Sequence, residues 1–166
     1  MNKIILFSGP IRSGKTSFLL DFYPKNPDLF DGFLAPDMDG LRKLLFLKDG
    51  IQLDFQLNDV NQKEFIAIGR FRFDKSVFEQ AANVLNNLAS SDRKYILIDE
   101  IGHLELDDHG FEPAFSDFLE AFKDINTESI LILIVRDGLL DNVRKKYGLT
   151  EASICNRSTI QAVFEK

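Results

Sequence analysis

The chain has 166 residues, which is enough for one α/β domain with a sizeable core and too few for two large domains. Its 20 basic residues are outnumbered by 26 acidic ones, for a formal net charge of -6, and no basic run is long enough to follow a phosphate backbone. We therefore predict a single domain of residues 1–166, a monomer or a weak homo-oligomer, and no nucleic-acid partner.

The first predicted element is a strand from Lys3 to Ser8, a nearly continuous apolar run rich in isoleucine. Such a run is typical of a strand that is buried on both faces of a parallel sheet. It is too short for a signal peptide or a membrane span, and the lone Cys155 cannot form a disulfide within the chain. We therefore expect a cytoplasmic protein with no membrane partner.

The segment from Gly9 to Thr16 directly follows this strand and fits the pattern G-x-x-x-x-G-K-[ST]. Glycine at both ends of the pattern lets the backbone curl so that successive N–H groups face phosphate oxygens. Lys15 offers a mobile charge to the β- and γ-phosphates, and Thr16 offers a hydroxyl to Mg²⁺. We predict a phosphate-binding loop, or P-loop, that holds a nucleoside triphosphate such as ATP. The residues predicted to contact it are Gly9, Pro10, Ile11, Arg12, Ser13, Gly14, Lys15, Thr16 and Ser17.

Residues 31–70 have a different sequence pattern. Asp-Gly pairs at Asp31, Asp39 and Asp49 separate short apolar runs such as Gly32 to Ala35. Asp-Gly between apolar runs is typical of hairpin turns. We predict a hairpin-rich insertion of antiparallel strands after the first helix, which extends one edge of the sheet rather than forming a separate domain.

Two further apolar runs predict core strands, from Tyr95 to Asp99 and from Ile130 to Val135. Each follows a segment with helical periodicity. The predicted helices span about Asp74 to Ala89, with a Ser76/Glu79 capping box, then Glu112 to Lys123, Gly138 to Tyr147 and Ser158 to Lys166. Alternating strands and helices predict right-handed crossovers and a mainly parallel sheet, and therefore an α/β fold.

Asp99 and Glu100 stand at the C-terminal end of a predicted core strand, where open α/β sheets bind ligands. An aspartate there holds Mg²⁺, usually through water, and the glutamate after it polarises a water for attack on the γ-phosphate. A solvated acidic turn is the alternative interpretation of Asp-Glu in isolation, and Lys15 and Thr16 upstream favour the metal site. A water-activating glutamate indicates hydrolysis, whereas a kinase must seat an acceptor and exclude water.

Two arginines have more than one interpretation. Arg12 lies within the loop, where it reaches the γ-phosphate or a neighbouring subunit, or else is a solvated side chain. Arg136 ends a predicted core strand and faces the same edge as Asp99 if the sheet is parallel. It either stabilises transition-state charge or makes a structural ion pair.

The segment from Asp99 to Leu106 reads DEIGHLEL. It resembles the signature of a family of small P-loop nucleoside triphosphatases, which reads DEIG, then Lys or Pro, then Met-Glu-Leu. Counterparts follow in order along most of the chain, at Gly32-Phe33, Gly69 to Phe78, Arg136, Leu139-Leu140 and Asn156-Arg157. The chain departs from the family at His103, Leu104 and Ser158, and none of these positions is a phosphate or metal ligand.

The resemblance implies a RecA-like P-loop fold, a three-layer sandwich, and slow, Mg²⁺-dependent hydrolysis of nucleoside triphosphates with broad base tolerance. It also implies that Arg157 stacks on the base or contacts it.

The leading hypothesis is hydrolysis of ATP, GTP and other nucleoside triphosphates to diphosphate and phosphate. Lys15, Glu100 and Arg136 are the predicted catalytic residues, and Thr16 and Asp99 are the predicted Mg²⁺ ligands. One alternative is a nucleotide or small-molecule kinase, in which residues 31–70 or 136–156 bind an acceptor. Another is a nucleotide-binding switch or adaptor with little turnover.

Overall fold

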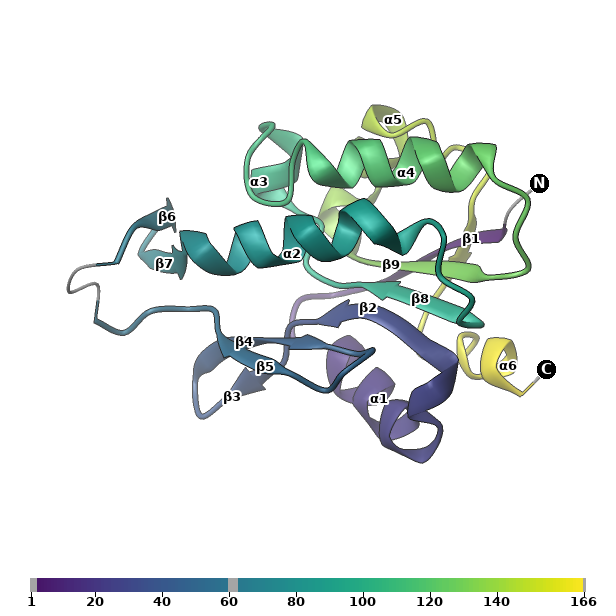
Figure 1. The fold of residues 1–166 in the computed structure, drawn as a ribbon, viewed down its shortest axis with the longest axis horizontal. Helices are drawn as coiled ribbons and strands as arrows, with labels where there is room; N and C mark the ends of the chain where they lie inside the picture. Colours follow the sequence, from purple (N-terminus) through teal and green to yellow (C-terminus); the bar gives the residue numbers. More distant parts are fainter. Residues whose placement is uncertain (1–2, 60–62, 166) are drawn as a thin grey trace.

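The computed structural model describes residues 3–59 and 63–165, which form a central sheet with helices on both faces (Figure 1). The eight strands of this sheet are β1 (Lys3–Gly9), β2 (Phe30–Leu34), β3 (Asp37–Met38), β4 (Leu41–Phe46), β5 (Gln52–Asp54), β8 (Tyr95–Ile98), β9 (Ile130–Arg136) and β10 (Ser153–Cys155). The helices are α1 (Lys15–Phe22), α2 (Lys75–Leu88), α3 (His103–Leu106), α4 (Ala114–Asp124), α5 (Leu140–Lys146) and α6 (Gln161–Phe164), with short 3₁₀ turns at Tyr23–Lys25, Pro27–Leu29 and Asp137–Leu139.

The strand order is β10-β1-β9-β8-β2-β4-β3, and β5 pairs with β4. The first five strands of this order run parallel, so their carboxyl ends meet at one edge of the sheet. β9 lies between β1 and β8, which separates the strand before the glycine-rich loop from the strand that leads to Asp99. The predicted α/β class with a mainly parallel sheet in a three-layer arrangement is confirmed.

Two apolar cores fill the spaces between the layers. β1 shows the alternation that separates them, because Leu6 packs under α2 and α4 while Ile5 and Phe7 pack against α1 and α6. All three side chains are at most 1% exposed. A strand that is buried on both faces cannot shift its register without exposing one of these sets, so the end of β1 is a rigid support for the loop that follows.

The amphipathic helices α2 and α4 form where the periodicity predicted them. The apolar face of α2 is buried, and so are the phenylalanines of α4. The Ser76/Glu79 capping box is a wrong prediction, because Asp74 occupies the N-cap position. Its Oδ1 atom accepts hydrogen bonds from the Ser76 backbone N at 2.9 Å and from Ser76 Oγ at 2.7 Å.

The interpretation of Asp31-Gly32 as a hairpin turn is wrong, because these residues lie inside β2, a parallel strand of the sheet centre that pairs with β8. Gly32 has a φ of 92°, and a Cβ atom there would lie 2.1 Å from the carbonyl oxygen of Leu97. The absence of a side chain at Gly32 therefore permits β2 and β8 to approach closely. The other two Asp-Gly pairs are turns, at the β3–β4 and β4–β5 connections.

Four elements were not predicted as such. β10 is a short edge strand, α3 is a single helical turn, and β6 (Phe65–Ile68) and β7 (Phe71–Asp74) form a separate two-stranded hairpin ahead of α2. All are too short for periodicity to reveal. Within residues 3–59 and 63–165, none of the helices has the length and apolar character needed to cross a membrane.

Replacing Gly32 by alanine should destabilise the fold strongly, because the new Cβ meets backbone that cannot move away. We expect a loss of roughly 2–4 kcal/mol in the free energy of unfolding, measured by urea denaturation. Gly40→Ala is the matched control, since Gly40 also has a positive φ of 81°, but, its chain neighbours aside, no other residue of 3–59 and 63–165 has an atom within 4 Å of its Cβ position. It should cost only about 1–2 kcal/mol, and equal losses in the two variants would contradict the steric explanation.

Candidate functional site

The loop between β1 and α1 is held tightly by its own backbone and by one lysine. Gly14 is the N-cap of α1 with a φ of 76°, and Arg12 has a left-handed φ of 59°. The Lys15 ammonium donates to the carbonyl oxygens of Gly9 and Pro10, at 2.9 and 2.8 Å. The N-cap residue Gly14 has no side chain to cap the first turn of α1, so the N–H groups of that turn are not satisfied by their own N-cap, an arrangement that favours anion binding.

Positive and negative groups near Lys15 both affect the pKa of its ammonium. Partial burial lowers the pKa of its ammonium, and the nearby Arg136 lowers it further. The carboxylates of Asp99, Asp137 and Glu100 oppose this shift. Arg136 and these three carboxylates therefore lie within electrostatic reach of the Lys15 ammonium.

Asp99 is the buried acid of the site, with 1% of its surface exposed. Its Oδ2 atom accepts from Thr16 Oγ1 at 2.7 Å and from the Ala35 backbone N at 3.0 Å, and its Oδ1 atom accepts from the Glu100 N at 2.9 Å. Burial, with the neighbouring Glu100 charge as second cause, raises the pKa of Asp99 to about 6. The two predicted metal ligands, Thr16 and Asp99, are therefore in direct contact.

The chemistry of this contact fits Mg²⁺. Magnesium prefers hard oxygen ligands, keeps several waters, and is usually held by one or two protein oxygens together with phosphates. Thr16 and Asp99 supply such oxygens beside the loop. A divalent cation there would also favour the ionised form of Asp99, which burial disfavours.

Glu100 lies beside Asp99 and points to a different partner. Its backbone is left-handed, with a φ of 67°, which is uncommon for a residue with a side chain. Its Oε1 atom forms an ion pair with Arg42 Nη1 at 2.9 Å, and about 30% of its side chain is exposed. Arg42, in β4, was not among the predicted site residues, because nothing in the local pattern of an antiparallel strand indicates which neighbour its side chain meets.

Arg136 and Arg157 lie on either side of the loop's start. Arg136 ends β9 in register with Gly9, so it stands at the same sheet edge as Asp99, as predicted. Arg157 follows β10, and its guanidinium carbon lies 5.9 Å from the Phe18 ring centroid. A Cβ atom on Gly14 would lie 3.4 Å from Arg157 Nη1, so this arginine covers the start of α1.

The remaining predicted loop residues are at the surface. Pro10, Ile11, Arg12 and Ser17 are exposed, with Ile11 at 62%. Ser13, Lys15 and Thr16 are less exposed than these four. The structure therefore brings together Lys15, Thr16, Asp99, Glu100 and Arg136 at one edge, with Arg12 outside this group.

Glu105 is a second buried carboxyl group in the DEIGHLEL segment, and its role there was not predicted. Its Oε2 atom accepts from the Gly102 N at 2.9 Å and its Oε1 atom accepts from the Phe111 N at 3.1 Å. Burial raises its pKa to about 7. Glu105 therefore ties the turn after Glu100 to the segment that precedes α4.

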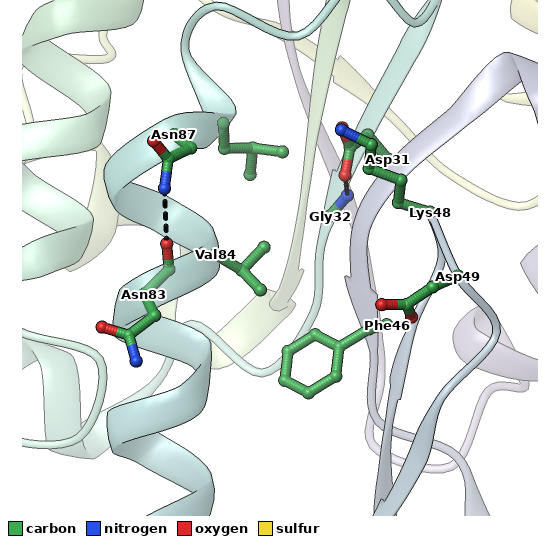
Figure 2. A pocket seen from close by; sticks show the side chains of 9 residues that line it. Asp31, Gly32, Phe46, Lys48, Asp49, Asn83, Val84 and Asn87 are labelled. Atoms are coloured by element: carbon green, nitrogen blue, oxygen red, sulfur yellow. Dashed lines mark hydrogen bonds between the residues drawn. The ribbon is translucent and has the colours of Figure 1, made fainter.

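Figure 2 shows a hollow elsewhere in the molecule, between α2 and the strands β2 and β4, with a volume of about 280 Å³. Val84 and Phe46 face each other across it, and Lys48 and Asp49 lie at its rim. It shares no residue with the loop or with Asp99 and Glu100, and it begins near the amino end of β2. The edge that carries the loop is therefore the candidate site.

The sequence matches the model of a protein family described as NTPase over residues 4–163. Solved structures with a similar fold include a human cancer-related nucleoside triphosphatase, with a TM-score of 0.62 and 21% identity, covering 94% of this chain and 88% of that one. Another is THEP1 from the hyperthermophile Aquifex aeolicus, with a TM-score of 0.67 and 22% identity, covering 99% of this chain and 96% of that one. No curated protein matches the chain. At these identities the structural likeness supports the fold alone.

Glu105 should make the stability of this protein depend on pH. Its pKa is about 7 in the folded chain, against an ordinary value of 4.5, so the folded state binds more protons between these values. The stabilisation is fully present below 4.5 and is lost as the pH rises through about 7. We expect the difference in unfolding free energy between wild type and Glu105→Gln to fall by about 2 kcal/mol from pH 5.5 to pH 8.

Urea denaturation at the two pH values measures this difference. Glu120→Gln, at an exposed position of α4, is the control and should show no such change. A difference for Glu105→Gln that stays constant between the two pH values would contradict the assignment.

Proposed function

This chain belongs to the NTPase family, and from that premise we propose that it hydrolyses nucleoside triphosphates, ATP and GTP among them, to the diphosphate and phosphate. The match agrees with the resemblance that DEIGHLEL indicated. The observation that carries the proposal is the 2.7 Å contact between Thr16 Oγ1 and Asp99 Oδ2, which joins the glycine-rich loop to the acidic end of β8. This contact supports a site in which a phosphate-binding loop and a carboxylate pair act on the same triphosphate.

In the proposed complex, the loop from Gly9 to Ser17 surrounds the β- and γ-phosphates. Its backbone N–H groups and the start of α1 face the phosphate oxygens, and the Lys15 ammonium contacts them from within the loop. Arg157 lies over the start of α1, and in the proposed complex it contacts the base attached to these phosphates. Its guanidinium is suited to stacking on a flat ring.

Mg²⁺, when bound, neutralises charge on the phosphates and helps to orient them. Thr16 and Asp99 are the residues that would hold it. The activation of water and the stabilisation of charge are assigned to side chains of the protein.

Glu100 is the proposed general base. It orients a water in line with the bond between the β- and γ-phosphates and accepts a proton from that water as the new oxygen–phosphorus bond forms. The bridging bond breaks at the same centre, and the diphosphate leaves with its electron pair. Lys15 and Arg136 stabilise the charge that develops on the phosphate oxygens.

Two substitutions separate binding from turnover. Lys15→Ala removes a charge-assisted contact to the phosphates, so we expect the Kd for ATP to rise by about 100-fold or more. Glu100→Gln retains shape but cannot accept a proton, so it should leave Kd within about threefold and lower kcat by roughly 10² to 10⁴. Phosphate release and nucleotide binding with ATP, GTP, CTP and UTP measure both quantities.

Lys145→Ala and Glu120→Gln are matched surface controls for these variants. Equal phosphate release by wild type, Lys15→Ala and Glu100→Gln would overturn the hydrolase proposal. Loss of ATP that depends on an added acceptor would indicate a kinase, and tight binding without turnover would indicate a switch.

Arg157→Ala should weaken binding of ATP by roughly 3- to 10-fold, because a cation–π contact with the base is lost. Inorganic tripolyphosphate has no base, so its Kd should remain unchanged in the same variant. Competition binding with the two ligands measures this. An equal loss for both ligands would place Arg157 on the phosphates instead.

A further inference from the structure

Four residues at one edge of the sheet, Ala35, Arg42, Asp99 and Glu100, form a closed ring of three hydrogen bonds and one ion pair. The Ala35 N donates to Asp99 Oδ2 at 3.0 Å, and the Ala35 carbonyl oxygen accepts from Arg42 Nη1 at 2.9 Å. The same Nη1 atom meets Glu100 Oε1 at 2.9 Å. The Glu100 N donates back to Asp99 Oδ1 at 2.9 Å. The ring therefore joins both carboxylates of the site to β4.

Arg42 is held firmly at its backbone. Its N donates to Gln56 Oε1 at 3.2 Å, and its carbonyl oxygen accepts from the N atoms of Phe55 and Gln56 at 3.2 and 2.8 Å. Arg42 also lies opposite Asp37 in the β3–β4 pairing. The main chain that carries the guanidinium is thus fixed on both sides.

The guanidinium has one neutral and one charged acceptor. Nη1 donates a hydrogen bond to Ala35 O, and the same atom lies 2.9 Å from Glu100 Oε1, its ion-pair partner. The neutral acceptor orients Arg42 whatever the charge on Glu100. Only one carboxylate oxygen of Glu100 is engaged by this contact, which leaves Oε2 to accept a proton.

The Arg42–Glu100 ion pair also reduces the repulsion between Glu100 and Asp99. Glu100 is one of the groups that raise the pKa of Asp99, and the positive charge of Arg42 opposes that effect. Two adjacent carboxylates repel each other, and a positive charge close to both relieves the repulsion. Both members of the ion pair are partly buried, with side-chain exposures of 27% and 30%, so solvent screens them less than a surface pair.

We propose that Arg42 is the positioning residue for Glu100, holding one oxygen of its carboxylate through the guanidinium so that the other oxygen faces the attacking water. The inference rests on the proposed hydrolysis at this site. It also gives the antiparallel strands at the sheet edge a part in turnover. A lysine would not replace Arg42 fully, because its ammonium is a rotating point charge on a flexible stem, whereas the planar guanidinium has fixed N–H directions.

Steady-state hydrolysis of ATP tests this role. Arg42→Ala should lower kcat by roughly 10- to 100-fold, as expected when a catalytic group is misplaced by about 1 Å, and should leave the Kd for ATP unchanged within about twofold. Arg42→Lys should recover part of the loss. Adding Arg42→Ala to Glu100→Gln should cause no further decrease, because the positioned group is already inactive.

Lys43→Ala is the control, since it removes the neighbouring Lys43–Asp54 ion pair from the same strand without touching Glu100. Thermal unfolding of each variant checks that the fold is retained. Arg42→Gln keeps a polar side chain and serves as the second variant if Arg42→Ala does not fold. It too should lower kcat without changing Kd.

The outcomes distinguish this inference from the proposed function. If Glu100→Gln lowers kcat but the Arg42 variants do not, hydrolysis stands and the role of Arg42 is overturned. A raised Kd with unchanged kcat, or losses that multiply in the double variant, would also overturn it, because Arg42 would then act independently of Glu100. Phosphate release that does not depend on Glu100 would reject the proposed function itself.

Discussion

Burial of the Asp99 carboxylate is the constraint on which the site depends. A carboxylate removed from water is costly unless donors surround it, and Asp99 obtains its donors from three places in the chain. They are the hydroxyl of Thr16 at the start of α1, the backbone of Ala35 after β2, and the backbone of Glu100. The hydrogen bonds to this one buried carboxylate therefore hold together the glycine-rich loop, the end of β8 and the end of β2.

The order of the parallel strands decides which groups can meet at that acid. Because β9 lies between β1 and β8, Arg136 stands beside the loop while Asp99 and Glu100 stand one strand further away. β2 follows on the other side of β8 and brings Ala35 to Asp99, and β4 brings Arg42 to Glu100. The two apolar cores hold these strands in a single register, so the polar groups at the strand ends keep fixed positions relative to one another.

The successes and failures of the predictions have a common cause. Long amphipathic segments such as α2 and α4 bury a continuous face, so their residues repeat at the helical period and are visible in the sequence. β10 and α3 are too short to repeat. Gly32 was misinterpreted because a glycine that ends a strand at a turn and a glycine that lets two strands approach look the same in one dimension.

The sequence by itself determined the loop from Gly9 to Thr16, the acidic pair Asp99 and Glu100, and the family, because these depend on residue types at short, regular spacings. Only the tertiary structure decided that β2 is a central strand, that Glu105 holds the turn after Glu100, and that Arg42 meets Glu100. These are contacts between segments whose separation along the chain carries no periodic signal. Their partners are selected by packing of the whole sheet, which a local pattern does not contain.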